Sequence, residues 1–319
     1  MSSRCTIGLA SFFVFSCFAA PAGAGALPFA AGGANASDVL SELDAFRAAL
    51  GPLNGNVPGS FGGGRREINW DGVPDGLSSP NAFPGDFFNA ATPGRARGAL
   101  FATDGTHFEV SARTPNPTNT PLNFGNIDPA YETTFQAFSP QRLFTAVGST
   151  VTETTFFVPG TITTPATVKG FGAIFNGVEI LGSARIECFD ALGAHLATVL
   201  APVGGSSGFS FAGVVMTGAE RIASVVIHSG TLAPLAGNVD DLLYGEDVVV
   251  MDDFIYGEPI SLGCPADLNG NGVVDGADLG IFLAAWGPNL GHPADFDGDG
   301  LVYGSDLGVL LSAWGACGE

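Results

Sequence analysis

Short apolar runs separated by Gly, Pro and Asn occupy the middle of the chain, from residue 54 to about residue 261. The runs are rich in β-branched and aromatic residues, which is typical of strands joined by turns. No helical spacing intervenes, so the pattern favours antiparallel strands over parallel β-α-β units and predicts a jelly-roll β-sandwich at residues 54–260. The strands are expected at 98–102, 106–112, 133–138, 150–158, 167–175, 178–189, 208–217, 221–228 and 248–251.

A helical spacing of apolar residues precedes this region. After Ser37, apolar side chains recur at intervals of three or four residues, and Gly51 with Pro52 ends the pattern. We therefore expect a linker and one short amphipathic helix within residues 27–53.

Residues 1–26 have the layout of a secretory signal peptide. Arg4 precedes the apolar run 7–20, and small residues end at Ala24 or Ala26. The apolar run has about 14 residues, whereas a membrane span needs about 20. We expect cleavage, no span in the mature chain, and a location outside the cell or at its surface. A lipoprotein acylated at Cys17 is an alternative that Phe15 disfavours.

The charge of the chain limits the kinds of molecule that it can bind. The chain has 31 acidic and 11 basic residues, and its largest basic cluster is the pair Arg65 and Arg66. Such a surface cannot displace counterions from phosphates, so nucleic acid is not expected as a partner. Residues 222–319 contain 15 Asp and Glu and no Lys or Arg, which indicates a need for cations in this region.

Two copies of one sequence pattern, 28 residues apart, end the chain at 267–287 and 295–315. Each copy opens with the spacing of a twelve-residue calcium loop, with oxygen ligands at positions 1, 3, 5, 9 and 12, a carbonyl at 7 and Gly at 6. Tyr303 stands at position 9 of the second copy, where a water molecule often mediates binding. The predicted Ca²⁺ ligands are Asp267, Asn269, Asn271, Val273, Asp275 and Asp278 in the first loop, and Asp295, Asp297, Asp299, Leu301 and Asp306 in the second.

Each loop runs into a short apolar stripe with helical spacing and ends at Gly287 or Gly315, which suit a left-handed cap. Neither helix could bury its stripe alone, so the two helices are expected to pack together. The carboxylates of each loop repel one another without a cation, so folding should depend on calcium. The stripes consist of Leu279, Phe282, Leu283 and Trp286, and of Leu307, Leu310, Leu311 and Trp314.

This segment, 261–319, resembles a type I dockerin. The family has two loop-helix calcium motifs without the leading EF-hand helix and docks on cohesin domains, usually to attach polysaccharide-degrading enzymes to a scaffold. Its cohesin contacts, often Ser-Thr and Lys-Arg, correspond here to 276–277 and 304–305, and to 283–284 and 311–312. These positions carry Gly-Ala, Gly-Ser, Leu-Ala and Leu-Ser. The resemblance implies a calcium fold whose partner is a cohesin-like or other surface protein.

Three cysteines remain after the predicted cleavage. Cys264 and Cys317 bracket the calcium segment, which suggests a disulfide, and Cys188 is interpreted as a buried strand thiol.

Candidate catalytic groups in the sandwich are few. Glu67, Asp71, Asp75 and Asp86 surround Trp70, so a sugar hydrolase could find an acid, a base and a stacking ring there. The alternative interpretation is a turn in which these carboxylates cap backbone amides or hold a structural calcium ion. Residues 204–208 match a nucleophile-elbow pattern but are better explained as a hairpin turn, and His107, His195, His228 and His292 show no metal spacing.

Two aspartate pairs, Asp240-Asp241 and Asp252-Asp253, are expected at the ends of late strands. The second pair, within Met-Asp-Asp-Phe-x-Tyr, resembles the closing strand of carbohydrate-binding jelly rolls, many of which hold a structural calcium there. A buried carboxylate requires a cation or hydrogen-bond donors. Two explanations for such a carboxylate are open: one further calcium ion in the sandwich, or hydrogen bonds from loop amides.

The sequence thus predicts a mainly β protein with a short N-terminal helix and a small α-helical calcium-binding, dockerin-like domain. Three functions fit it. The preferred one is an exported non-catalytic sandwich, with a polysaccharide as candidate ligand, attached to a partner through the calcium module. The alternatives are a glycoside hydrolase, that is, an O-glycosyl hydrolase, and a structural surface or matrix protein.

Overall fold

The computed structural model describes residues 25–218, 220–261, 264–269, 273–289, 292–296 and 300–316. Apart from Gly25 and Ala26, the predicted signal peptide lies outside these residues. Within them the chain is mainly β with antiparallel sheets, as the sequence predicts, and it contains four α-helices. No described helix has both the length and the apolar character that crossing a membrane requires.

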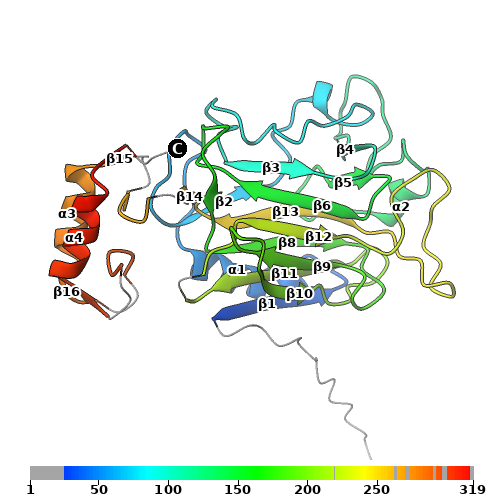
Figure 1. The fold of residues 1–319 in the computed structure, drawn as a ribbon. Helices are drawn as coiled ribbons and strands as arrows, with labels where there is room; N and C mark the ends of the chain where they lie inside the picture. Colours follow the sequence, from blue (N-terminus) through cyan, green and yellow to red (C-terminus); the bar gives the residue numbers. More distant parts are fainter. Residues whose placement is uncertain are drawn as a thin grey trace, which may run out of the picture.

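Two large antiparallel sheets form the body of the molecule (Figure 1). The first has the order β1-β11-β8-β13-β5-β4, with β2 also paired to β13, and the second has the order β10-β9-β12-β6-β3. The strands of the first are β1 Ala26–Gly33, β2 Arg65–Ile68, β4 His107–Val110, β5 Phe144–Val147, β8 Gly170–Asn176, β11 Phe209–Met216 and β13 Val250–Gly257. Those of the second are β3 Ala99–Ala102, β6 Val151–Phe156, β9 Arg185–Phe189, β10 His195–Leu200 and β12 Ser224–His228.

The main core lies between the two sheets. In the five-stranded sheet, alternate residues of β9 and β12 are buried, so one face meets the core and the other faces outward. In the seven-stranded sheet, β8, β11 and β13 are buried along their whole lengths. Their outer face must therefore also be covered.

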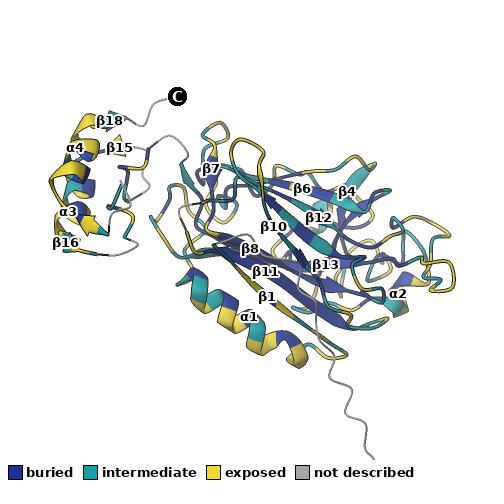
Figure 2. Ribbon diagram, turned by 60° about the horizontal axis from the view of Figure 1, so that its bottom comes forward, coloured by how far each residue is buried: buried dark blue, intermediate teal, exposed yellow. Residues whose placement is uncertain are grey.

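Helix α1 (Ser37–Leu50) provides that cover, and the predicted helix is confirmed. Figure 2 shows its buried side turned toward β1 and β11. Val39, Leu43, Phe46 and Leu50 pack with apolar residues of the sheet's outer face. The Phe46 ring lies over Gly172 and Gly213, where an added Cβ would be 2.9 and 3.1 Å from the ring. Glycine on two neighbouring strands thus makes room for the helix.

Several expectations about the β region are wrong. Residues 27–33, expected as linker, belong to β1, because the backbone of this strand pairs with β11 along its whole length although Ala and Gly mask the strand pattern. Residues 133–138 form no strand; α2 (Tyr131–Thr134) stands there, in a turn that begins where Asp128 accepts the amide of Ala130. Residues 204–208 are no hairpin turn, because they connect strands of different sheets, β10 and β11.

Short elements complete the chain. The segment 75–77 is a 3-10 helix, and β7 (Ala166–Thr167) pairs with β14 (Ile260–Ser261) beside the sandwich. The C-terminal module, which we define as the described residues of 264–316, contains α3 (Gly276–Ala284) and α4 (Gly304–Ser312). It also contains β15 (Val273–Val274), β16 (Gly287–Pro288), β17 (Leu301–Val302) and β18 (Gly315–Ala316).

A buried ion pair joins the start of the sandwich to its last long strand. Arg66 of β2 donates to both carboxylate oxygens of Glu258, at 2.9 and 2.7 Å, and both side chains are fully buried. Asn54 and the amide of Phe61 also donate to Glu258, at 2.7 and 3.2 Å. Glu258 therefore holds the loop 54–64 against the end of β13.

We expect Glu258→Gln to destabilise the fold by about 3–5 kcal/mol, because the substitution leaves the Arg66 guanidinium buried without its counter-ion. Denaturant unfolding of the whole chain measures this change. The control is Glu153→Gln on the exposed side of β6, which should change the unfolding free energy little. Equal effects of the two substitutions would contradict the role assigned to Glu258.

Candidate calcium-binding sites

The two copies of the C-terminal repeat pair reciprocally. β15, which lies within the first loop, pairs with β18 after the second helix, and β17 of the second loop pairs with β16 after the first helix. Phe282 of α3 and Leu310 of α4 are fully buried in one shared apolar cluster with Val274 and Val302. The two copies therefore bury their apolar residues against each other, as the sequence predicts.

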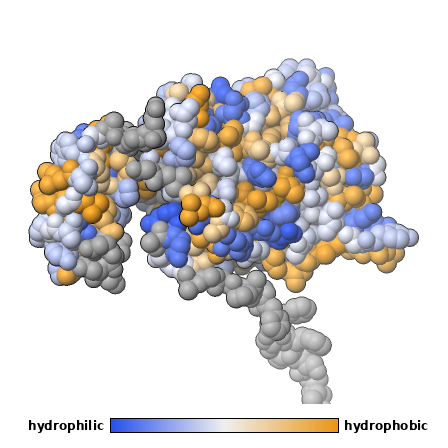
Figure 3. Space-filling model, viewed as in Figure 1, coloured by the Kyte–Doolittle hydropathy of each residue, from blue (hydrophilic) through white to orange (hydrophobic). Residues whose placement is uncertain are grey.

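Half of the predicted stripes remain outside this cluster. Leu283 and Trp286 of the first copy are 53% and 51% exposed, and Leu311 and Trp314 of the second are 51% and 49% exposed. Each nine-residue helix contributes one fully buried apolar side chain to this cluster, Phe282 from α3 and Leu310 from α4. Figure 3 shows apolar side chains on the face of the module that turns away from the sandwich.

Asp278 and Asp306, at position 12 of the two loops, are fully buried. Asp278 accepts the amides of Asn269 at 3.0 Å and Asp275 at 2.9 Å. Asp306 accepts the amides of Phe296, at position 2 of its loop, at 2.8 Å and of Tyr303 at 3.1 Å. Each carboxylate thus connects the start of its loop to the start of its helix, and these donors offset its desolvation.

Other predicted ligands have defined places. Asp267 is buried, and Asp295 accepts the amide of Gly300 at 2.8 Å, which joins position 1 of the second loop to position 6. Gly300 has φ +85°, as the sharp turn requires. Val273 and Leu301, the predicted carbonyl ligands, lie in β15 and β17. Asn271, Asp297 and Asp299 lie outside the described residues.

Asp275 has a second role in the first copy. Its carboxylate accepts the amide of Ala277 at 2.7 Å and caps α3. A water-mediated contact at position 9 is compatible with this cap, because the second oxygen of the carboxylate can bind water.

The two cysteines that the structure describes differ in whether they form a disulfide. Cys264 is disulfide-bonded, and its predicted partner, Cys317, lies outside the described residues. Cys188 is a free thiol in β9, and complete burial raises its pKa. It is therefore a packing residue, as predicted, because a reactive thiol needs an exposed and electropositive setting.

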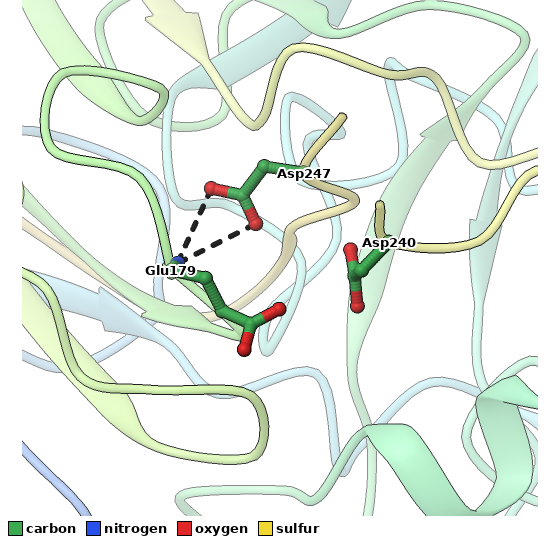
Figure 4. A group of neighbouring side chains, drawn as sticks. All are labelled: Glu179, Asp240 and Asp247. Carbon is green, nitrogen blue, oxygen red and sulfur yellow. Dashed lines mark hydrogen bonds between the residues drawn. The ribbon is translucent and has the colours of Figure 1, made fainter. Parts of the chain in front are cut away.

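Three carboxylates converge from the loop between β8 and β9 and the loop between β12 and β13 (Figure 4). One oxygen each from Glu179, Asp240 and Asp247 lies within 4.8 Å of the others. Asp247 is buried and accepts the amide of Ile180 at 3.0 Å, and Asp240 accepts the amide of Val248 at 2.6 Å. Three converging carboxylates are a donor set that suits Ca²⁺, which binds oxygen ligands at about 2.3–2.6 Å.

The electrostatics of this group are unfavourable without a cation. Burial raises the pKa of Glu179, and the neighbouring Asp240 and Asp247 carboxylates raise it further. Burial, together with Asp247, likewise raises the pKa of Asp240. Sequence reasoning found Asp240 but missed Glu179 and Asp247, because only the fold brings residue 179 to the loop that precedes β13.

The expectation that both aspartate pairs end strands is wrong. Asp240 and Asp241 lie in the loop between β12 and β13, whereas Asp252 and Asp253 lie inside β13 at a register irregularity and are both buried. Asp252 accepts the amide of Phe138 at 2.6 Å, and Asp253 accepts the hydroxyl of Ser139 at 2.7 Å. Hydrogen bonds to a loop thus satisfy this pair, which was one of the two open explanations.

The carboxylates proposed for sugar hydrolysis have structural contacts. Asp71 accepts the amides of Gln141 and Arg142 at 2.6 and 3.2 Å, and Asp75 accepts from Arg113 and Arg142 at 2.9 and 2.6 Å. Arg113 accordingly lowers the pKa of Asp75, whereas burial raises that of Asp71. Glu67 accepts from Arg47 at 3.0 Å and Asp86 is exposed.

The cavity beside Asp71 is also small. It measures about 160 Å³ and is lined by Asp71, Arg113, Pro140, Gln141 and Arg142. Ligand pockets usually measure about 300–1,000 Å³. Capping of loop amides, the second interpretation of these residues, is what Asp71 does.

Trp70 cannot stack on a sugar as suggested from the sequence. It is 1% exposed, lies parallel to the Phe144 ring with centroids 4.0 Å apart, and donates its indole N–H to the carbonyl of Asp252 at 2.8 Å. Its φ of +63° is rare for a large residue, and this packing holds it there. Trp70 is therefore a core residue.

Comparisons with known proteins identify no family. No family model and no curated protein matches the sequence. Among solved structures, a match is the enzymatically active domain of tailspike protein 4 of bacteriophage CBA120, at 16% identity and a TM-score of 0.17. It covers 53% of this chain and 22% of the tailspike chain. A TM-score this low establishes neither a shared fold nor a shared function.

The Asp252–Asp253 pair predicts a pH dependence of stability. Burial, reinforced by Asp253, raises the pKa of Asp252 well above 3.8, and Asp71 adds to this. The folded state therefore holds the Asp252 proton to higher pH than the unfolded chain does. Its contribution to stability is full below pH 3.8 and is lost as pH rises through the folded-state pKa.

We expect Asp252→Asn to remove this dependence, because a neutral amide keeps an acceptor for Phe138 and a donor toward Asp253. Relative to wild type, the variant should gain stability from acidic to neutral pH. Thermal unfolding across this range measures the difference, with exposed Asp86→Asn as control. Parallel curves for wild type and Asp252→Asn would contradict the assignment. Glu67 and Arg47, which face Asp253, are unchanged in every variant.

Proposed function

We propose that the protein is an exported, non-catalytic β-sandwich of jelly-roll type that a dockerin-like, calcium-dependent module attaches to a partner at or outside the cell surface. The observation that carries the proposal is the reciprocal pairing of two loop-helix copies, each closed by a buried aspartate at position 12. The spacing of oxygen-bearing residues in each copy supports Ca²⁺ as the ion, with Asp in place of the usual Glu at position 12. A cohesin-like or other surface protein is the proposed partner.

The exposed face of the module supports a docking role. Leu283 and Leu311 occupy the helix positions at which a dockerin carries cohesin contacts, and Trp286 and Trp314 lie one turn further along. Exposed apolar patches of this kind mark interaction sites. The proposed partner surface is therefore apolar, in contrast to the polar contacts that Ser-Thr and Lys-Arg would make.

The sandwich is proposed to bind and not to hydrolyse, with polysaccharide as its candidate ligand. The contacts of Glu67, Asp71 and Asp75 with arginines and loop amides support this choice, because a hydrolase needs two free carboxyls across a cleft. A further calcium ion in the sandwich is proposed at Glu179, Asp240 and Asp247, because Asp252 and Asp253 already have donors.

Removal of one aspartate from each loop tests the calcium module. We expect Asp267→Ala with Asp295→Ala to abolish calcium binding by the module and to lower its helicity, while the sandwich stays folded. Calorimetric titration and circular dichroism of the whole chain with and without Ca²⁺ measure both effects. The control is exposed Asp86→Ala, which should behave as wild type. Helicity and calcium heats that are unchanged in the double variant would contradict the proposal.

Incubation with a panel of insoluble polysaccharides separates binding from hydrolysis. We expect the protein to be retained on an insoluble polysaccharide without releasing reducing sugars from it. Turnover that Asp71→Asn abolishes at an unchanged unfolding midpoint would instead establish a hydrolase. Neither retention nor turnover would favour a structural surface protein.

A further inference from the structure

The first loop of the C-terminal module rests on a glycine of the sandwich. A Cβ added to Gly62 would lie 2.5 Å from the carbonyl oxygen of Leu268 and 3.5 Å from the Cα of Asn269. Gly62 also has φ +70°, which L side chains rarely adopt. Figure 1 shows the module beyond the end of the sandwich at which β14 lies. Two backbones therefore approach so closely here that any side chain at residue 62 would separate them.

The sandwich side of this contact is fixed in place. Glu258 accepts the amide of Phe61, the residue before Gly62, and Arg66 donates to the carbonyl of Gly59 at 2.9 Å. The hydroxyl of Ser60 donates to the carbonyl of Pro259. The loop 54–64 is thus tied to the same point, residues 258 and 259, from which the chain continues toward the module.

The module side of the contact belongs to the predicted first calcium loop. Leu268 stands at position 2 and Asn269 at position 3, between ligand Asp267 and the rest of the loop. The amide of Asn269 donates to buried Asp278, so the position of this backbone follows that of the position-12 carboxylate. A cation held by Asp267, Asn269 and Asp278 would fix the stretch that meets Gly62. Without a cation, the Asp267 and Asp278 carboxylates repel each other, which opposes this placement of the loop.

We propose that Gly62 is a seat for the first calcium loop, and that calcium in this loop locks the module in one orientation against the sandwich. The inference rests on the calcium binding proposed above and adds to it a mechanical consequence. The exposed helix face that carries Leu283 and Leu311 then has a fixed direction relative to the sandwich only in the calcium-loaded protein.

Small-angle X-ray scattering of the full chain, with Ca²⁺ and with chelator, tests the seat. The variant is Gly62→Ala and the matched control is Gly59→Ala. Gly59 also has a positive φ, of +93°, but an added Cβ there has no heavy atom within 4 Å. We expect calcium to decrease the maximum dimension of wild type and of Gly59→Ala but not of Gly62→Ala.

Calcium titration of the same proteins distinguishes the contact at Gly62 from calcium binding by the first loop. Gly62→Ala should still bind calcium, with about fivefold weaker affinity at one site, the order of a modest coupling between two linked events. If wild type binds calcium but its scattering does not change, or if Gly62→Ala contracts like wild type, the seat is refuted and the calcium module stands. If wild type binds no calcium in the module, both proposals fail.

Discussion

The buried ion pair between Arg66 and Glu258 is the constraint on which the arrangement of the chain depends. It joins β2 to the end of β13, and through Asn54 and Phe61 it fixes the loop that precedes β2. Two charges without solvent are stable only when each has its full set of partners, and Arg66 completes its set with the carbonyls of Ala96 and Gly59. The last strand of the sandwich and the path toward the module therefore share one anchor with the N-terminal loop.

Burial explains which parts of the fold the sequence could predict. Strands β9 and β12 have one outward face, so the alternation of their side chains identifies them. Strand β8 is buried on both faces because α1 covers its outer face. Its continuous apolar run is typical of such a strand and therefore also predicts it. By contrast, β1 contains Ala and Gly and owes its conformation to hydrogen bonds with β11. A strand whose conformation depends on pairing with its neighbour's backbone has no side-chain pattern of its own, and local patterns also cannot determine the order of strands in a sheet.

The same distinction applies to the candidate sites. The ligands of each C-terminal loop lie within twelve residues, so their spacing alone predicts their convergence. Glu179 and Asp247 are 68 residues apart and come together only because their loops meet. Trp70 shows the opposite error: a surface role was inferred from its acidic neighbours, whereas the ring fills the core against Phe144. Sequence neighbours of a side chain do not determine its environment when the backbone turns sharply beside it.

The amide contacts of Asp278 and Asp306 bear on the calcium-dependent folding that we propose for the module. Each of these carboxylates already receives two backbone amides, so part of the cost of burying it is met without a metal. A loop closed in this way presents its remaining oxygens in one place before a cation arrives, which lowers the entropy lost on binding. The repulsion among the other carboxylates opposes closure, and no Lys or Arg in residues 222–319 can offset it. In the calcium binding proposed here, affinity therefore reflects the balance between amides that favour the closed loop and carboxylates that oppose its closure.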